Sequence, residues 1–242
     1  GTRGAFVELM GVVDEDDNDI TTVNAEITNS TSVMLTTVAG NPAAIGYVSL
    51  GSLSDEVKAI KVDGVAATVE DINNGTYKVA RPFLVAYKDG SLTNVAQDFL
   101  NYIMSDDGQA IINEEGYISV AEGNTYTASG MSGRIVLAGS TSVSPVMEVL
   151  ADAYKALNPD VTIEIQQTGS GAGITSAIEG VCDFGMSSRA LTDEEAAELV
   201  NTQIATDGIA VVVNNENPVE DMTSDQIKGI YLGEITDWSE IQ

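Results

Sequence analysis

Three turns built from small residues dominate the stretch 134–189. The first, Gly139-Ser-Thr-Ser142, follows a strand-like run and precedes Pro145, a residue typical of helix starts. The second is Thr168-Gly-Ser-Gly-Ala-Gly173, and the third ends the run Asp183-Phe-Gly-Met-Ser-Ser-Arg189. Each turn follows a β-like segment and leads into a helix-like one. A fold with this alternation directs backbone N–H groups and hydroxyls toward a common point, where they can bind an anion.

Simple helix capping is the competing interpretation of each turn. Ser142 or Ser144 could cap a helix that starts at Pro145 in any protein, because serine hydroxyls accept from the free N–H groups of a first turn. One Gly-Ser-Gly sequence alone is therefore a weak indication of a binding site. Capping does not require three turns to meet, however, so their repetition at this spacing favours an anion site.

The charge balance limits the possible partners. The 242 residues include 10 Lys and Arg against 37 Asp and Glu, which gives a formal net charge of −27. Nucleic-acid binding needs a basic face and is not expected. The negative charge also opposes long-range capture of a free anion, so an anion site here must act through local donors.

The residue types also restrict the chemistry. Histidine is absent, which excludes Ser-His and Cys-His catalysis, and Cys182 is the only cysteine, which excludes an internal disulfide. The acidic segment Asp14–Asp19 begins like an EF-hand loop. Its sixth position is Asp19 rather than glycine, and its twelfth is Ala25 rather than glutamate. We therefore predict a solvated acidic loop, no metal site and no cofactor.

Hydrophobic patterning predicts an alternation of helices and strands. The first helix starts at Gly1, and Ala5, Phe6 and Leu9 lie at helical spacing within it. The segment 122–133 is polar and rich in small residues, and it is the best candidate for a linker. Predicted strands cover 44–50, 57–62, 82–87, 134–138, 161–165 and 209–213. Predicted helix caps are Ser105 or Asp106, Thr192 with Glu195, and Thr223 with Gln226.

The three turns and their spacing resemble those of the periplasmic-type phosphate-binding proteins that feed phosphate ABC transporters, the PstS-like proteins. Residues 134–242 are similar to the first half of that family and residues 1–122 to its second half, so the order is permuted relative to the family. The resemblance implies an α/β fold of the two-lobed periplasmic-binding-protein type, similar to type II. One lobe would comprise 80–213, including the linker 122–133, and the other 1–79 plus 214–242.

The resemblance also implies a set of phosphate-binding residues, which come mainly from the three turns. The possible additional contacts are weaker matches to the family pattern. The phosphate-binding residues are Thr141, Ser142, Ser170, Ser187, Ser188, Gly1 and Thr2. The possible additions are Arg189, Ser140, Gly169 and Asp207.

Two departures from the family pattern affect this site. Many members have an aspartate where this chain has Ser188, and that aspartate accepts a proton from phosphate, so selectivity against sulfate is open. The family's pocket arginine falls in a segment expected before Gly1, which this chain lacks as a permuted molecule or as part of a tandem protein. Arg189 could replace that arginine if Asp207 orients it, or it could form a structural ion pair instead.

The resemblance implies a solute-binding protein without catalytic activity. Inorganic phosphate would be its ligand and the permease subunits of an ABC transporter its partner. The protein would be exported to the cell surface, and membrane contact would occur only through a lipid anchor outside this chain. The alternatives are a non-binding phosphate sensor or interaction module, a binder of another oxyanion such as sulfate, and, least favoured, a metal-dependent phosphoryl enzyme.

Overall fold

The computed structural model describes residues 1–16 and 18–241. Asp17 of the acidic loop and Gln242, the last residue of the predicted split lobe, lie outside the described residues. The chain divides into two compact units. The first unit contains Gly1 and Arg81–Asp207, and the second contains Thr2–Ala80 and the chain from Gly208 onward. The fold is mixed α/β, as predicted from the sequence.

The first unit is built on a sheet whose strand order is β8-β4-β7-β5-β6. Strand β5 pairs in parallel with both β6 and β7, whereas β4 is antiparallel to β7. The strands of this unit are β4 (Ala80–Tyr87), β5 (Ser132–Gly139), β6 (Asp160–Gln167), β7 (Phe184–Ser187) and the first part of β8 (Val200–Asn214). Its helices are α4 (Asn94–Ile103), α5 (Asp106–Glu114), α6 (Ser144–Leu157), α7 (Ser170–Glu179) and α8 (Asp193–Glu198).

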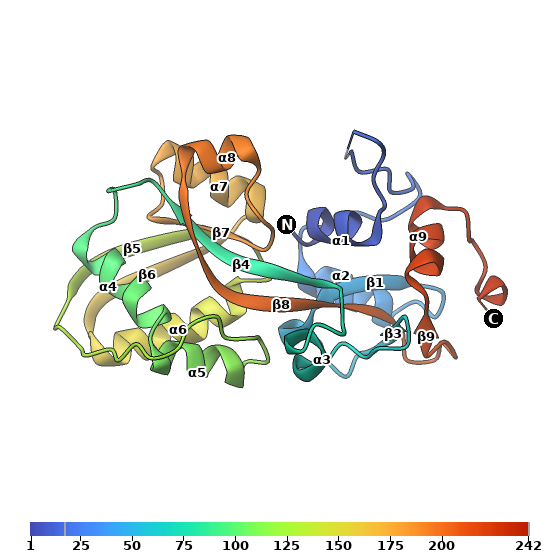
Figure 1. The fold of residues 1–242 in the computed structure, drawn as a ribbon, viewed down its shortest axis with the longest axis horizontal. Helices are drawn as coiled ribbons and strands as arrows, with labels where there is room; N and C mark the ends of the chain where they lie inside the picture. The colour runs from blue at the N-terminus through green and yellow to red at the C-terminus, as the bar shows by residue number, and fades with distance from the viewer. Residues whose placement is uncertain (17, 242) are drawn as a thin grey trace. The chain divides into compact units, whose positions relative to one another are not determined.

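Helices cover both faces of this sheet. Figure 1 shows α4, α5 and α6 on one side of β5 and β7 and α7 and α8 on the other. The larger core joins the first three helices to the strands, with Phe99, Tyr154 and Phe184 among its buried residues. A smaller core lies under α7 and includes Ile174 and Ala177. Two-sided coverage is what parallel strands require, because both of their faces must be buried.

Close packing of α7 against the strands depends on glycine. A Cβ atom at Gly173 would overlap the carbonyl oxygen of Ala138 and the Cα atom of Gly139. One at Gly185 would lie 2.7 Å from the carbonyl oxygen of Gly173. The missing side chains therefore let the helix backbone approach the strands directly, which sets the position of its N-terminus.

The predicted linker is anchored along its length. Asp98 accepts hydrogen bonds from Tyr126 (2.7 Å), Ser129 (3.1 Å) and Tyr154 (2.7 Å). Asn158 donates to the Tyr126 hydroxyl at 2.9 Å and accepts from the N–H of Met131 at 3.2 Å. The segment has no helix or strand before β5 begins at Ser132, but it is fixed to α4 and α6 through these polar groups.

The second unit contains a smaller sheet region. Strands β1 and β2 are antiparallel to the last part of β8, and β3 is parallel to β9. Phe6 stacks on Tyr47, with ring centroids 3.8 Å apart, and meets Tyr231 edge-on. The elements are α1 (Thr2–Met10), α2 (Thr31–Ala39), β1 (Ile45–Ser49), a 3₁₀ turn (Leu50–Ser52), β2 (Val57–Ala59), β3 (Lys61–Val62), α3 (Val69–Asn73), β9 (Asp221–Met222), α9 (Ser224–Leu232) and a 3₁₀ turn (Trp238–Glu240).

Most predicted elements are present, and their differences have local causes. The caps at Ser105, Thr192 and Thr223 are confirmed, the last two as full capping boxes. Of the three residues at helical spacing in α1, Ala5 and Phe6 are buried, whereas Leu9 is 42% exposed. Strand β8 is far longer than 209–213, because it continues from one unit into the other.

The acidic loop is a local hydrogen-bonded turn. Asp14 accepts from the backbone N–H groups of Asp16 and Asn18, both at 2.9 Å, and from the Asn18 side chain. Among the described residues there is no group of three or more acidic or Cys side chains placed to hold a metal ion. Over the same residues, no helix is both long and apolar enough to span a membrane.

Candidate functional site

The three predicted turns meet at one edge of the first unit's sheet. Each follows the carboxyl end of a parallel strand, and the register pairs Gly139 with Gln167 on one side and with Met186 on the other. The carbonyl of Gly139 accepts from the N–H groups of Thr168 (3.0 Å) and Gly169 (2.7 Å). The N–H of Ser140 donates to the carbonyl of Met186 at 3.0 Å. The turns are therefore joined directly, at the sheet edge where α/β proteins commonly bind ligands.

The first turn is held by Ser140 rather than by the serines expected as caps. The Ser140 hydroxyl accepts from the N–H groups of Ser142 (3.2 Å) and Val143 (3.3 Å). The Ser144 hydroxyl donates back to the carbonyl of Ser140 at 2.9 Å. Ser142 is buried and Thr141 half-buried in this turn. The N-cap position of α6 is Val143, which makes no side-chain cap, so neither of the two serines expected as caps occupies that position.

The second turn leaves the start of α7 without a side-chain cap. The capping position is Gly169, with φ 90°, a conformation that favours glycine. Cβ atoms placed at Gly169 or Gly171 would meet nothing within 4 Å, so the space around these glycines is open. The first N–H groups of a ten-residue helix thus adjoin open space beside Ser170.

Ser170 and the third turn are connected through hydroxyl and amide groups. The Ser170 hydroxyl oxygen accepts from the N–H of Ser188 at 3.2 Å and lies 3.4 Å from the Ser188 hydroxyl oxygen. The Ser187 hydroxyl donates to the carbonyl of Arg189 at 2.9 Å and accepts from the Arg189 N–H at 3.3 Å. The Ser187 proton therefore stabilises its own turn, whereas Ser170 keeps its proton free to donate to a ligand or to Ser188.

Gly1 lies beside the same two serines. A Cβ atom added to Gly1 would overlap the hydroxyl oxygen of Ser170 and lie 2.7 Å from that of Ser188. The structure thus brings Gly1, Ser170 and Ser188 together, although 169 residues separate the first two in sequence. Thr2, by contrast, is the first residue of α1 and belongs to the second unit.

Arg189 forms a structural ion pair with Glu195. Its guanidinium makes two hydrogen bonds to that carboxylate, at 2.8 and 2.7 Å, and a third to the carbonyl of Ala190. The pair lowers the pKa of Glu195 and raises that of Arg189, because the hydrogen bonds favour both charged forms. Our expectation that Asp207 orients Arg189 was wrong, since Glu195 is nearer along the chain and reaches it from the start of α8.

Asp207 instead pairs with Arg81, a residue that we did not single out from the sequence. The carboxylate lies 3.0 Å from both Nε and Nη2 of Arg81, and both side chains are almost fully buried. Arg81 also donates through Nη1 to the carbonyl of Ser188 at 3.3 Å. The sequence signal for this role is that a charged residue, Arg81, directly precedes the predicted apolar strand 82–87.

The two guanidiniums near the serines are both paired with carboxylates. Arg189 is held by Glu195, and Arg81 is held by Asp207. The donors that we expect at this point are therefore neutral hydroxyl and amide groups.

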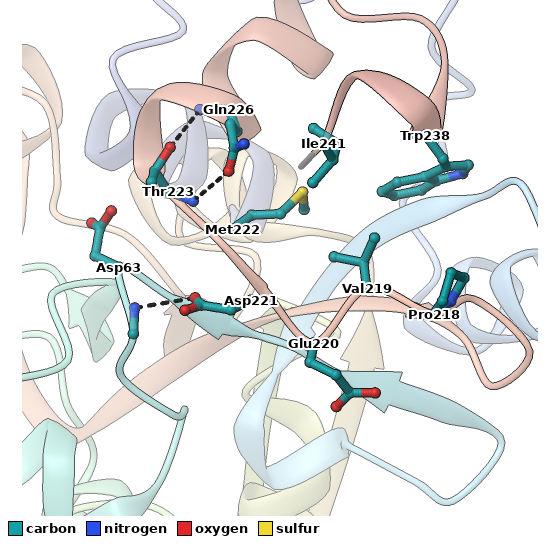
Figure 2. A pocket seen from close by; sticks show the side chains of 11 residues that line it. Asp63, Pro218, Val219, Glu220, Asp221, Met222, Thr223, Gln226, Trp238 and Ile241 are labelled. Atoms are coloured by element: carbon teal, nitrogen blue, oxygen red, sulfur yellow. Dashed lines mark hydrogen bonds between the residues drawn. The ribbon is translucent and has the colours of Figure 1, made fainter.

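A separate pocket of about 720 Å³ lies in the second unit, and we call it the acidic pocket. Figure 2 shows Asp63, Glu220 and Asp221 around it together with Trp238, Met222 and Ile241. Its carboxylates have partners, since Asp63 accepts from Ser224 and Asp221 accepts from the N–H of Gly64. Their negative charge makes the acidic pocket unsuited to an anion.

The comparisons with known proteins agree with this arrangement. A family model described as a PBP superfamily domain matches residues 124–242. Phosphate-binding protein PstS 2 of Streptococcus agalactiae is 50% identical over 246 residues, covering 100% of this chain and 84% of that protein. Its namesake in Streptococcus pneumoniae is 44% identical with the same coverage. A crystal structure of a phosphate-binding protein of a phosphate ABC transporter from S. pneumoniae superposes with a TM-score of 0.80 at 43% identity, covering 100% of this chain and 95% of that one.

Fold and site together define a solute-binding protein of the periplasmic-binding-protein class. At these identities and coverages, the chain belongs to the PstS family of phosphate-binding proteins. Because the alignments with the streptococcal relatives extend over the whole chain, we expect those relatives to share its order of segments. The permutation relative to the rest of the family remains a prediction.

Proposed function

We propose that this chain binds inorganic phosphate at the turns where Ser170, Ser188 and Gly1 meet. The observation that carries the proposal is the convergence of these residues beside the uncapped start of α7. Hydroxyls and helix N-terminal amides suit a dehydrated anion, because they donate hydrogen bonds without adding a competing charge. Thr141, Ser142 and Ser187 lie in the adjoining turns and remain predicted contacts, as does Thr2 of the second unit.

The donor set favours an oxyanion rather than a neutral ligand. Burying an unpaired charge costs several kcal/mol, so the anion must be satisfied by many donors at once. The Ser170 hydroxyl keeps its proton while it accepts from the N–H of Ser188, so it can donate to the anion. These features support phosphate binding in a chain whose overall charge is −27.

The wider role follows from the family. We infer that the protein delivers phosphate to the permease subunits of an ABC transporter, as the S. pneumoniae neighbour is described as a phosphate ABC transporter protein. We further infer export to the cell surface. The relatives are named as binding proteins, and we propose no catalytic activity here.

Isothermal titration of the protein with phosphate tests the proposal, and a parallel titration with sulfate tests selectivity. Saturable phosphate binding with a stoichiometry near one is the expected result. Binding of sulfate with equal affinity would change the proposed ligand to oxyanions in general, because Ser188 offers no carboxylate to accept the phosphate proton. Absence of binding by both anions would favour a non-binding sensor or interaction module.

A further inference from the structure

The Arg81–Asp207 ion pair stands at both points where the chain passes between the units. Arg81 is the first residue of the long segment of the first unit, and Asp207 is its last. The side chains are 1% and 0% exposed, so the pair is removed from water. A buried ion pair contributes little net stability, because desolvation offsets the attraction. Its presence therefore calls for a role besides stability.

The geometry of the guanidinium indicates that role. Asp207 engages Nε and Nη2, and Nη1 is directed at the carbonyl of Ser188. Strand β4 is antiparallel to β7, with Leu84 opposite Ser187, so the start of β4 lies beside the turn that follows β7. Arg81 thus approaches the third turn from the sheet edge while its carboxylate partner holds the guanidinium in place.

The same turn contributes to the proposed site through its amide and its hydroxyl. The N–H of Ser188 donates to the Ser170 hydroxyl, and the carbonyl of Ser188 accepts from Arg81. The N–H and the carbonyl belong to the two peptide planes on either side of the Ser188 Cα atom, so the two hydrogen bonds together restrict the backbone of this turn. The effect continues to Ser170, whose oxygen is occupied by this N–H and whose proton is left to donate.

We propose that Arg81 is a positioning residue for the anion site, which it serves by orienting the Ser188 turn. The inference rests on the proposed phosphate binding and deepens it. Asp207 is the orienting partner of Arg81 and has no direct contact with the ligand. Arg81 and Asp207 form an ion pair, so the proposed role of Arg81 is to hold the turn and not to supply a free positive charge.

Three variants of the full chain test the inference, with phosphate titration and urea unfolding measured on each. The double variant Arg81→Met with Asp207→Leu removes the whole pair, and apolar replacement of a buried pair is commonly neutral or stabilising. Arg81→Lys keeps the positive charge, but an ammonium group cannot bind both Asp207 and the carbonyl of Ser188 with the fixed geometry of a guanidinium. Arg134→Gln is the matched control. It removes one exposed arginine that pairs with Glu164, about 16 Å along β5 from Gly139 at roughly 3.3 Å per residue.

We expect the double variant to bind phosphate at least tenfold more weakly than the parent while unfolding at a similar urea concentration. The phosphate affinity of Arg81→Lys should lie between those of the double variant and the parent. The affinity of Arg134→Gln should stay within twofold of the parent. Because the double variant removes one positive and one negative charge together, weaker binding in it reports lost orientation rather than lost charge.

Binding by the double variant within twofold of the parent would overturn the inference. If that variant does not unfold cooperatively, Arg81→Lys decides, since an affinity within twofold of the parent contradicts the orienting role. Failure of the parent to bind phosphate would instead reject the proposed function, so the two failures are distinguishable.

Discussion

The hydroxyl oxygen of Ser170 accepts a hydrogen bond from the backbone N–H of Ser188 at 3.2 Å. This bond joins the second and third turns of the candidate site, which are consecutive β-to-α connections of the same sheet. An accepting hydroxyl keeps its own proton for a further partner, which here can be the Ser188 hydroxyl at 3.4 Å or a bound ligand. The pair therefore shows how the fold prepares neutral donors for an anion.

Replacing Ser170 with alanine should weaken phosphate binding by about 1–3 kcal/mol, the typical cost of leaving a buried acceptor without its donor. Ser176→Ala is the matched control on the same helix, because that hydroxyl only donates to the carbonyl of Ala172 one turn back. Titration calorimetry of both variants gives the comparison. Equal affinities for Ser170→Ala and the parent would remove Ser170 from the site.

Two glycines of α7 should respond in opposite ways to alanine. Gly173→Ala forces a methyl group into the backbone of β5, and overpacking of this kind costs about 1–3 kcal/mol. Gly171→Ala meets open space, and the better helix propensity should stabilise the protein by up to about 1 kcal/mol. Urea unfolding measures both. Similar destabilisation by the two substitutions would contradict the close contact between α7 and β5.

The sequence predicted the parts of this site that depend on local chemistry. The capping box at Thr192, just after the third turn, depends on residues three apart, and each turn is marked by glycine and serine in one short stretch. The parallel strands then bring those turns together by a general rule of α/β folds. Such features need no knowledge of distant contacts.

Partners of the charged residues could not be predicted in the same way. From the sequence we expected Asp207 as the partner of Arg189, whereas the structure pairs Arg189 with Glu195 of α8. Arg81 and Asp207 are 126 residues apart, and only the pairing order of the sheet places them together. The anchoring of segment 122–133 likewise depends on Asp98, and no local sequence pattern indicates that Asp98 binds this segment.

That anchoring can be tested with Tyr126→Phe, which removes one hydroxyl and leaves the ring in place. Its hydroxyl donates to Asp98 and accepts from Asn158, and hydrogen bonds to a charged group are worth about 1.5–3 kcal/mol. We expect a loss of roughly that size in the free energy of unfolding. Unchanged stability, measured in urea, would show that this segment behaves as a free linker.

The ion pair between Arg189 and Glu195 should make a pH-dependent contribution to stability. Its hydrogen bonds lower the pKa of Glu195 in the folded protein, so the contribution is complete above the unfolded pKa, near 4.5, and is lost as the pH falls through the lower folded value. The difference in unfolding free energy between the parent and Glu195→Gln should therefore be constant above about pH 5.5 and shrink below about pH 4.5. A difference that grows on acidification would reverse the assigned sign.

Gly1 offers a steric test of the site itself. A Cβ atom there would overlap the Ser170 hydroxyl and lie 2.7 Å from the Ser188 hydroxyl oxygen, so Gly1→Ala should push apart the two serines that are proposed to contact phosphate. Both hydroxyls belong to turns at strand ends, where a small shift is possible without unfolding the sheet. We therefore expect phosphate affinity to fall at least tenfold, about 1.4 kcal/mol, while the urea midpoint changes little. Calorimetry and urea unfolding on the same preparation separate the two effects. An affinity equal to that of the parent would mean that phosphate does not bind where Gly1, Ser170 and Ser188 meet.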